Sequence, residues 1–311
     1  MAQPDTSKVT GTWRDWATDK VIRATIRAAL ALPWKQRSRA MGRLMARVVA
    51  PRAGWRDRAL ANLHHVWPDM SETRRRDIAD RVADNAGRTM IENYDVHGLL
   101  NLMRDEPLQG AGLEPMEQAR AEGRPILFLT GHYGNFEAPR AALVARGWRI
   151  GGLYRPMSNP YFNAHYAANM HALSDPVFEQ GRRGTMGLIR HIREGGMGVL
   201  LFDVYDSAGR PINFLGQPAP TLTSAADIAL KTGALLVPFF GIRRADGSGF
   251  DPVFEAPIPH GDPLEMMQEA TRRLEARIND DPGQWFWIHR RWKPKRQKKR
   301  QRKRAAATMA P

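Results

Sequence analysis

The sequence predicts an α/β protein in which a mixed, mainly parallel sheet is sandwiched between helices and preceded by an amphipathic helical N-terminal segment. Two observations support this fold class. Helical periodicity runs through most of the first hundred residues, and after Met103 short apolar runs alternate with helical segments. Strands that alternate with helices are typical of a parallel sheet that helices cover on both faces.

The N-terminal segment is predicted to be helical. From Trp13 to about Leu32 apolar residues recur at helical spacing beside a basic strip, and a second helical face continues to Pro51. Tryptophan combined with lysine and arginine is typical of helices that lie in a membrane interface. An ordinary packed helical pair of a soluble domain explains the same pattern. Further helices are expected over 56–66 and 71–100.

The second half of the chain supplies the predicted sheet. We expect strands at 126–130, 148–154, 198–202 and 234–242, with an edge strand at 250–254. Helices are expected at 138–146, 163–173, 185–194, 225–232 and 264–279, and a last short element at 285–288. We divide the chain into a disordered start (1–12), a membrane-facing helical segment (13–105), an α/β core (106–292) and a basic disordered tail (293–311).

The charge of the chain is concentrated near its C-terminal end. The formal net charge is +15, and the run from Lys293 to Arg304 holds nine Lys or Arg and no acid. Such a run fits an anionic membrane surface or nucleic acid. It contains no aromatic residue that would stack on bases, so we favour the membrane surface and expect no specific nucleic acid partner.

The composition also excludes several kinds of chemistry. The chain has no cysteine, which rules out disulfides, thiolate nucleophiles and thiolate metal sites. No His-Glu-x-x-His spacing occurs, and we expect neither a metal ion nor a cofactor. No apolar run reaches about 18 residues, so we predict no transmembrane helix, and the polar start predicts no signal peptide.

The first candidate site follows the buried run Ile126–Leu129. His132 lies in the turn after this run, between Gly131 and Gly134, which would permit close approach of a ligand. Glu137 follows where a helix should begin. Transfer of an acyl group to a hydroxyl needs a base, and histidine titrates near neutral pH. A carboxylate on the second ring nitrogen would fix the tautomer and stabilise the imidazolium, so we predict a His132–Glu137 pair. The structural alternative is a core histidine beside a capping glutamate.

Other candidates follow neighbouring predicted strands. Arg155 comes after the second strand, where a guanidinium would hold a phosphate or form a structural salt bridge. Arg182 is a second phosphate candidate in a glycine-flanked loop. Asp203 ends the third strand, and two roles remain open for it: orienting Arg155 or hydrogen-bonding the acceptor. The carboxyl ends of parallel strands are where α/β sheets bind ligands.

Four stretches carry a resemblance to a known family. His132-Tyr-Gly-Asn-Phe-Glu137 resembles the His-x4-Asp/Glu motif of glycerolipid-type acyltransferases, and more narrowly the bacterial lipid A late acyltransferases (lauroyl and myristoyl transferases). The similar blocks are Tyr154-Arg-Pro-Met-Ser-Asn159, Phe202-Asp-Val-Tyr-Asp206 with Phe214-Leu-Gly216, and Asp281-Pro-Gly-Gln-Trp-Phe-Trp-Ile-His-Arg-Arg-Trp-Lys293. The last stretch is long and specific, and the similarity spans about Trp34 to Lys293.

The resemblance implies an enzyme that moves a fatty acyl chain from acyl-carrier protein to a hydroxyl of a lipid A precursor. It implies catalytic roles for His132 and Glu137, and substrate-binding roles for Arg155, Asp203, Arg182 and Asn135. The expected location is the cytoplasmic face of the cell inner membrane, either peripheral or monotopic. The alternatives are an acyltransferase for an ornithine lipid, another amino lipid or a lysophospholipid, and a non-catalytic basic protein that binds membrane or RNA.

Overall fold

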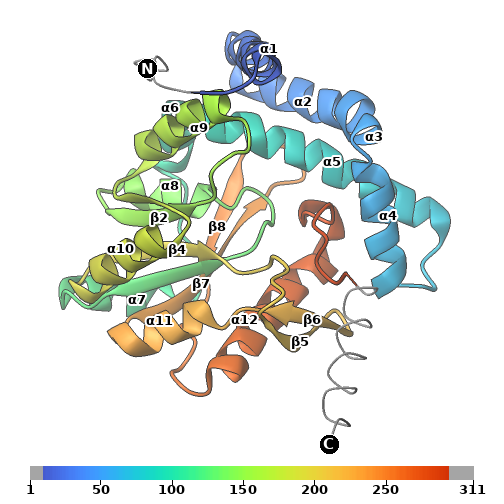
Figure 1. The fold of residues 1–311 in the computed structure, drawn as a ribbon. Helices are drawn as coiled ribbons and strands as arrows, with labels where there is room; N and C mark the ends of the chain where they lie inside the picture. The colour runs from blue at the N-terminus through green and yellow to red at the C-terminus, as the bar shows by residue number, and fades with distance from the viewer. Residues whose placement is uncertain (1–9, 294–311) are drawn as a thin grey trace, which may run out of the picture.

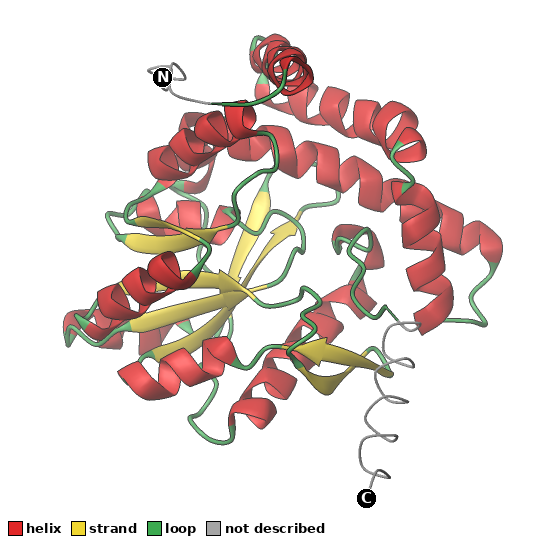
Figure 2. Ribbon diagram, viewed as in Figure 1, coloured by secondary structure: helices red, strands yellow, loops and turns green. Residues whose placement is uncertain are grey.

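A six-stranded sheet forms the centre of the protein, with helices on both of its faces (Figures 1 and 2). The structure is a computed structural model that describes residues 10–293. The strands of the sheet lie in the order β3 (Val177–Glu179), β2 (Ile150–Tyr154), β4 (Met197–Leu201), β1 (Ile126–Thr130), β7 (Leu235–Arg243) and β8 (Phe250–Phe254). The pairs from β3 to β7 are parallel and β8 is antiparallel to β7, which confirms the predicted fold class.

Helices make up most of the N-terminal third and connect the strands that follow. The first group comprises α1 (Trp13–Leu30), α2 (Trp34–Leu44), the π-helix η1 (Met45–Val49), α3 (Ala50–Arg52), α4 (Trp55–Val66), α5 (Glu72–Tyr94), α6 (Val96–Met103) and α7 (Leu113–Ala121). The second group comprises α8 (Ala138–Val144), α9 (Pro160–Leu173), α10 (Arg182–Arg193), α11 (Ser224–Thr232), α12 (Pro263–Asp280) and the 3-10 turn η2 (Pro282–Gln284).

β1 shows why the sheet needs cover on both faces. All five of its residues are buried. Leu127 and Leu129 belong to one apolar cluster, while Ile126 and Phe128 belong to another on the opposite face. Side chains alternate along a strand, so a continuous apolar run can be buried only between two layers.

The predicted helix and strand boundaries agree closely with the structure, and the exceptions have local causes. The helix expected over 71–100 is two helices, because Asp95 ends α5 and its carboxylate then accepts the N–H of Gly98 in the first turn of α6. The expected element at 285–288 lies outside the strands and helices, where Trp285 forms only an isolated bridge with Tyr133. The elements that were not predicted include helix α7, the short strand β3, and the antiparallel hairpin of β5 (Arg210–Phe214) with β6 (Gln217–Thr221).

The N-terminal helices share a core with the α/β part of the chain. Leu63 of α4 and Ile78 of α5 belong to the same apolar cluster as Leu127 of β1. A buried ion pair adds a polar anchor, because both carboxylate oxygens of Glu92 on α5 accept hydrogen bonds from Arg243 on β7, at 2.6 and 2.8 Å. α5 is therefore fixed directly to the sheet.

The outer surface of α1 exposes apolar side chains. Trp13 and Trp16 are 74% and 52% exposed, and Val21 is exposed on the same helix. Within residues 10–293 no helix combines the length and the apolar composition that a membrane crossing requires. The disordered start lies mostly outside the described residues, and so does the basic tail after Lys293.

Candidate active site

The loop between β1 and α8 holds His132 in a narrow space. Gly134 has a φ of +56°, and a Cβ added there would lie 2.0 Å from the carbonyl oxygen of Gly241. Only glycine fits this left-handed conformation beside another backbone. A Cβ added to Gly131 would meet Leu274 at 2.8 Å. The two glycines therefore allow other parts of the protein, the Gly241 backbone and the Leu274 side chain, to pack closely against the loop. The sequence had suggested that they make space for a ligand.

His132 pairs with Asp203 through the register of two neighbouring strands. β1 and β4 are parallel, with Thr130 opposite Leu201, so the residues two positions further on lie side by side. His132 Nδ1 is 2.7 Å from Asp203 Oδ1, and the backbone N–H of His132 donates to Asp203 Oδ2 at 2.8 Å. The indole N–H of Trp285 donates to the same Oδ2 at 2.9 Å. The carboxylate is thus fixed by three donors.

The predicted pairing of His132 with Glu137 is corrected by this geometry. Asp203 occupies Nδ1, and no hydrogen bond joins His132 to Glu137 in the described part of the chain. Glu137 lies at the N-cap of α8, and its carboxylate pairs instead with Arg140 at 3.4 Å. Of the two roles left open for Asp203, orienting Arg155 is not observed, because the side chain is fully buried and pairs with His132 instead.

The electrostatics of the pair favour a charged carboxylate. Burial alone would raise the pKa of Asp203, but the charge of His132 and the hydrogen bonds from its ring and backbone outweigh burial. The pKa of Asp203 is therefore held well below its usual range. When His132 carries one proton, on Nδ1, the ionised Asp203 accepts that hydrogen bond and the Nε2 lone pair is left free to act as a base.

A second histidine lies against the first. The rings of His132 and His289 meet edge to face, with centroids 4.5 Å apart, and His289 Nε2 has no hydrogen-bond partner among the described residues. Burial, followed by the effect of His132, lowers the pKa of His289 to about 3, so this ring is neutral at pH 7. The sequence indicated no individual role for His289 or Trp285, although both lie in the specific stretch Asp281–Lys293.

A mainly apolar cavity of about 350 Å³ opens beside this pair. Its wall includes His132, Glu137 and His289, together with side chains from α4, α5 and α9 and from the loops after β1 and β2. The apolar part consists largely of Met45, Trp55, Val82, Ala86, Met90, Phe136, Met157, Phe162, Met170, Leu173 and Phe286. Met157 is also solvent-exposed, so it marks the mouth of the cavity. The cavity has the size and lining of a site for an apolar chain.

Among the described residues, the other predicted substrate-binding residues form no hydrogen bond or ion pair with His132. Arg155 is exposed and does not line the cavity, although Met157, two residues further along the same loop, does. Arg182 is exposed at the start of α10, where it lines a different depression. Asn135 is buried; its amide donates to Glu92 at 3.2 Å, and its oxygen accepts the N–H of Glu137. Residues 10–293 contain no cluster of three or more metal-ligating side chains.

The neutral, enclosed His289 predicts a pH dependence of stability. Its folded pKa of about 3 is below the value near 6.5 expected for the unfolded chain. The contribution of the neutral His289 ring to the free energy of unfolding is therefore complete above about pH 6.5. It falls as the pH drops from 6.5 towards 3, because in this range only the unfolded state binds the proton. Between pH 7 and pH 5, His289→Gln should lose less unfolding free energy than the wild type, by up to about 2 kcal/mol.

Urea unfolding at the two pH values measures this difference. His171→Gln is the control, because His171 is half exposed and forms its ion pair with Asp175 at the surface. A pH dependence of His289→Gln identical to that of the wild type would mean that the His289 ring accepts a proton in the folded state.

Comparison with known protein sequences identifies a family and several named relatives. The model of the family described as "Bacterial lipid A biosynthesis acyltransferase" matches residues 4–294. The chain is 23% identical over 267 residues to a lipid A biosynthesis acyltransferase of Haemophilus influenzae, covering 83% of this chain and 81% of that protein. It is 26% identical over 243 residues to the lipid A biosynthesis lauroyltransferase of Escherichia coli K12, covering 75% and 77%. It is 24% identical over 251 residues to the myristoyltransferase of the same organism, covering 75% and 73%.

The protein is therefore an α/β acyltransferase, with a histidine–carboxylate pair beside an apolar cavity. It belongs to the bacterial lipid A biosynthesis acyltransferase family, as the resemblance of its four sequence stretches indicated.

Proposed function

We propose that the protein transfers a fatty acyl chain from an acyl-carrier-protein thioester to a hydroxyl group of a lipid A precursor. The observation that carries this proposal is the His132–Asp203 pair at the wall of an apolar cavity. A base whose second nitrogen is held by a buried carboxylate suits activation of a hydroxyl. An apolar cavity beside that base suits a hydrocarbon chain. The relatives' names identify lipid A biosynthesis as the pathway in which they act.

The proposed reaction uses the two nitrogens of His132 differently. Nδ1 keeps its proton on the side of Asp203, and Nε2 takes the proton of the acceptor hydroxyl as its oxygen attacks the thioester carbonyl. The new C–O bond forms a tetrahedral intermediate, whose collapse breaks the C–S bond. His132 then returns the proton to the departing thiolate. Asp203 stabilises the imidazolium between these steps, and no group on the enzyme is acylated.

The carboxylate of Glu137 has a different proposed role. It lies in the cavity wall at the start of α8, and its partner Arg140 is fully buried and also donates to the carbonyl of Ile150 at 3.0 Å. We assign Glu137 to positioning the loop that carries His132. Arg155 precedes the cavity-mouth residue Met157 by two positions, where an exposed guanidinium suits the phosphate on the donor's phosphopantetheine arm.

The surface of α1 supports a peripheral position on the cytoplasmic face of the inner membrane. Its exposed tryptophans suit the headgroup zone of a bilayer. The amide of Asn159 donates to the Asp15 carbonyl of α1 at 2.8 Å, which fixes α1 beside the segment that carries Met157. The cavity mouth would then lie near the membrane surface, from which a lipid acceptor would enter.

The test is acceptor-dependent transfer by the purified protein. With an acyl-carrier-protein thioester and a lipid A precursor, mass spectrometry should show the acceptor gaining one acyl chain for each free thiol released. Parallel reactions contain a lysophospholipid or an ornithine lipid in place of the precursor. Transfer to one of those lipids alone would change the proposed acceptor, and thiol release without an acylated product would contradict the proposal.

A further inference from the structure

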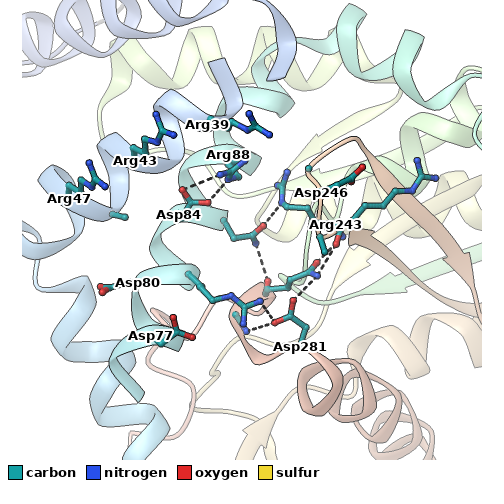
Figure 3. Close-up of a pocket in the computed structure, with 18 residues that line it drawn as sticks. Arg39, Arg43, Arg47, Asp77, Asp80, Asp84, Arg88, Arg243, Asp246 and Asp281 are labelled. Atoms are coloured by element: carbon teal, nitrogen blue, oxygen red, sulfur yellow. Dashed lines mark hydrogen bonds and ion pairs between the residues drawn. The ribbon is translucent and has the colours of Figure 1, made fainter. Parts of the chain in front are cut away.

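A second, charged cleft of about 570 Å³ is bordered by α2, η1, α5 and the turn that joins β7 to β8. Figure 3 shows the α2–η1 arginines on one side of it, residues of α5 in the middle and the turn between β7 and β8 on the other side. Asn85 of α5 lines both the cleft and the apolar cavity. The proposed reaction uses no residue of this cleft.

The unpaired charges of the cleft include a row of three arginines. Arg39, Arg43 and Arg47 follow one another at four-residue intervals, which places them on one face of the helix. All three are exposed, and no hydrogen bond or ion pair of their side chains joins them to another described residue. Most of the other arginines in the cleft are neutralised, as by the pairing of Arg88 with Asp84 and of Arg81 with Asp281. The guanidinium groups of Arg39, Arg43 and Arg47 are therefore available to bind an anion.

Close packing brings this row of arginines next to carboxylates. A Cβ added to Gly42 of α2 would lie 2.4 Å from Asp84 Oδ1, so the glycine lets the two helices approach closely. Asp77, Asp80 and Asp84 then border the cleft along α5. Asp84 is paired with Arg88 and Asp80 with Arg56, whereas no ion pair joins Asp77 to another described residue, so Asp77 would repel a polyanionic surface such as an acidic protein or a nucleic acid strand. The oxygens of all three carboxylates keep lone pairs. They would accept hydrogen bonds from hydroxyl groups, so the cleft suits a small ligand that carries both phosphate and hydroxyls.

Asn85 forms the partition between the two sites. Its amide donates to the carbonyls of Gly134 and Gln284 at 3.2 and 3.1 Å, and its oxygen accepts from Arg243 at 2.7 Å. The charged cleft therefore lies next to the loop that carries His132, with Asn85 between the two sites. We propose that the cleft binds the phosphorylated sugar headgroup of the lipid acceptor, with Arg39, Arg43 and Arg47 as the phosphate ligands. This inference rests on the proposed function.

The first experiment compares two triple variants that lose the same charge. Arg39→Gln/Arg43→Gln/Arg47→Gln should raise the KM for a phosphorylated lipid A precursor at least about 10-fold, with little change in kcat or in the KM of the acyl donor. Arg149→Gln/Arg190→Gln/Arg193→Gln removes three exposed arginines outside the cleft and should leave these values unchanged. With a dephosphorylated acceptor, the cleft variant and the wild type should behave alike. An equal loss with both acceptors, or a loss confined to the donor KM, would overturn the proposal.

The second experiment needs no acyl transfer and so separates this inference from the proposed function. Calorimetry with the wild-type protein should show that glucosamine 6-phosphate binds more tightly than either glucosamine or inorganic phosphate. The cleft variant should lose this binding, and the control variant should keep it. Equal affinity for inorganic phosphate and the sugar phosphate would reduce the cleft to a simple anion site and overturn the sugar assignment.

Discussion

Replacing His132 with glutamine is expected to lower kcat/KM for acyl transfer by at least about 10³-fold. The amide cannot take the proton of the acceptor hydroxyl, and the variant also loses the imidazolium that Asp203 would stabilise. Initial rates of acylated product, measured with saturating donor and varied acceptor, give the effect. The side chain is 24% exposed and lines the cavity, so the folded state should tolerate the substitution.

The control for this substitution is another histidine with a carboxylate partner. His171 pairs with Asp175 at 2.6 Å but lies outside the apolar cavity. His171→Gln should therefore keep the wild-type rate. Wild-type turnover by His132→Gln, with native circular dichroism for both proteins, would eliminate His132 as the base.

The second large effect is expected from Asp203→Asn, which should lower kcat/KM by about 10² to 10⁴-fold. The carboxylate now accepts from Nδ1 and the backbone N–H of His132 and from the Trp285 indole. An amide has one acceptor oxygen for these three donors, and its own NH₂ group would face another N–H. The ring would lose the tautomer that leaves Nε2 free.

Glu137→Gln distinguishes the two carboxylates near His132. Among the described residues the Glu137 carboxylate forms its ion pair with Arg140, at 3.4 Å, so we expect the rate to fall by less than about 10-fold. The comparison uses the same donor and acceptor for both variants, with thermal unfolding as a check on folding. A severe loss in Glu137→Gln beside a near-normal Asp203→Asn would restore the sequence-based pairing of His132 with Glu137.

The sheet was predictable because its central strands are buried on both faces. The run Ile126–Thr130 was placed correctly, since a short apolar segment that ends in a glycine turn is typical of a buried strand. The hairpin of β5 and β6 was not predictable in the same way. Three prolines interrupt its two strands, and its turn places Leu215 and Gly216 at positive φ. Its pattern therefore lacks the alternation that indicates a strand.

The sequence allowed candidate site residues to be named, but it did not show which of them contact one another in the fold. His132 and Asp203 are 71 residues apart, and only the order of the strands makes them neighbours. The same order places β4 between β1 and β2, and Arg155, which follows β2, does not line the cavity that His132 borders. Glu137 is close to His132 in sequence, but the start of α8 directs its carboxylate to Arg140. Local spacing could not reveal any of these three outcomes.

The hydrogen bond from Trp285 to Asp203 makes the geometry of the site depend on the C-terminal stretch of the chain. The strands that carry His132 and Asp203 leave the ribosome first, whereas the indole that fixes the carboxylate is made 82 residues after Asp203. A chain that terminates before Trp285 would lack this donor and also the core side chains of Trp285, Trp287 and Trp292. The site is therefore complete only after the C-terminal stretch has been made and has packed against the sheet.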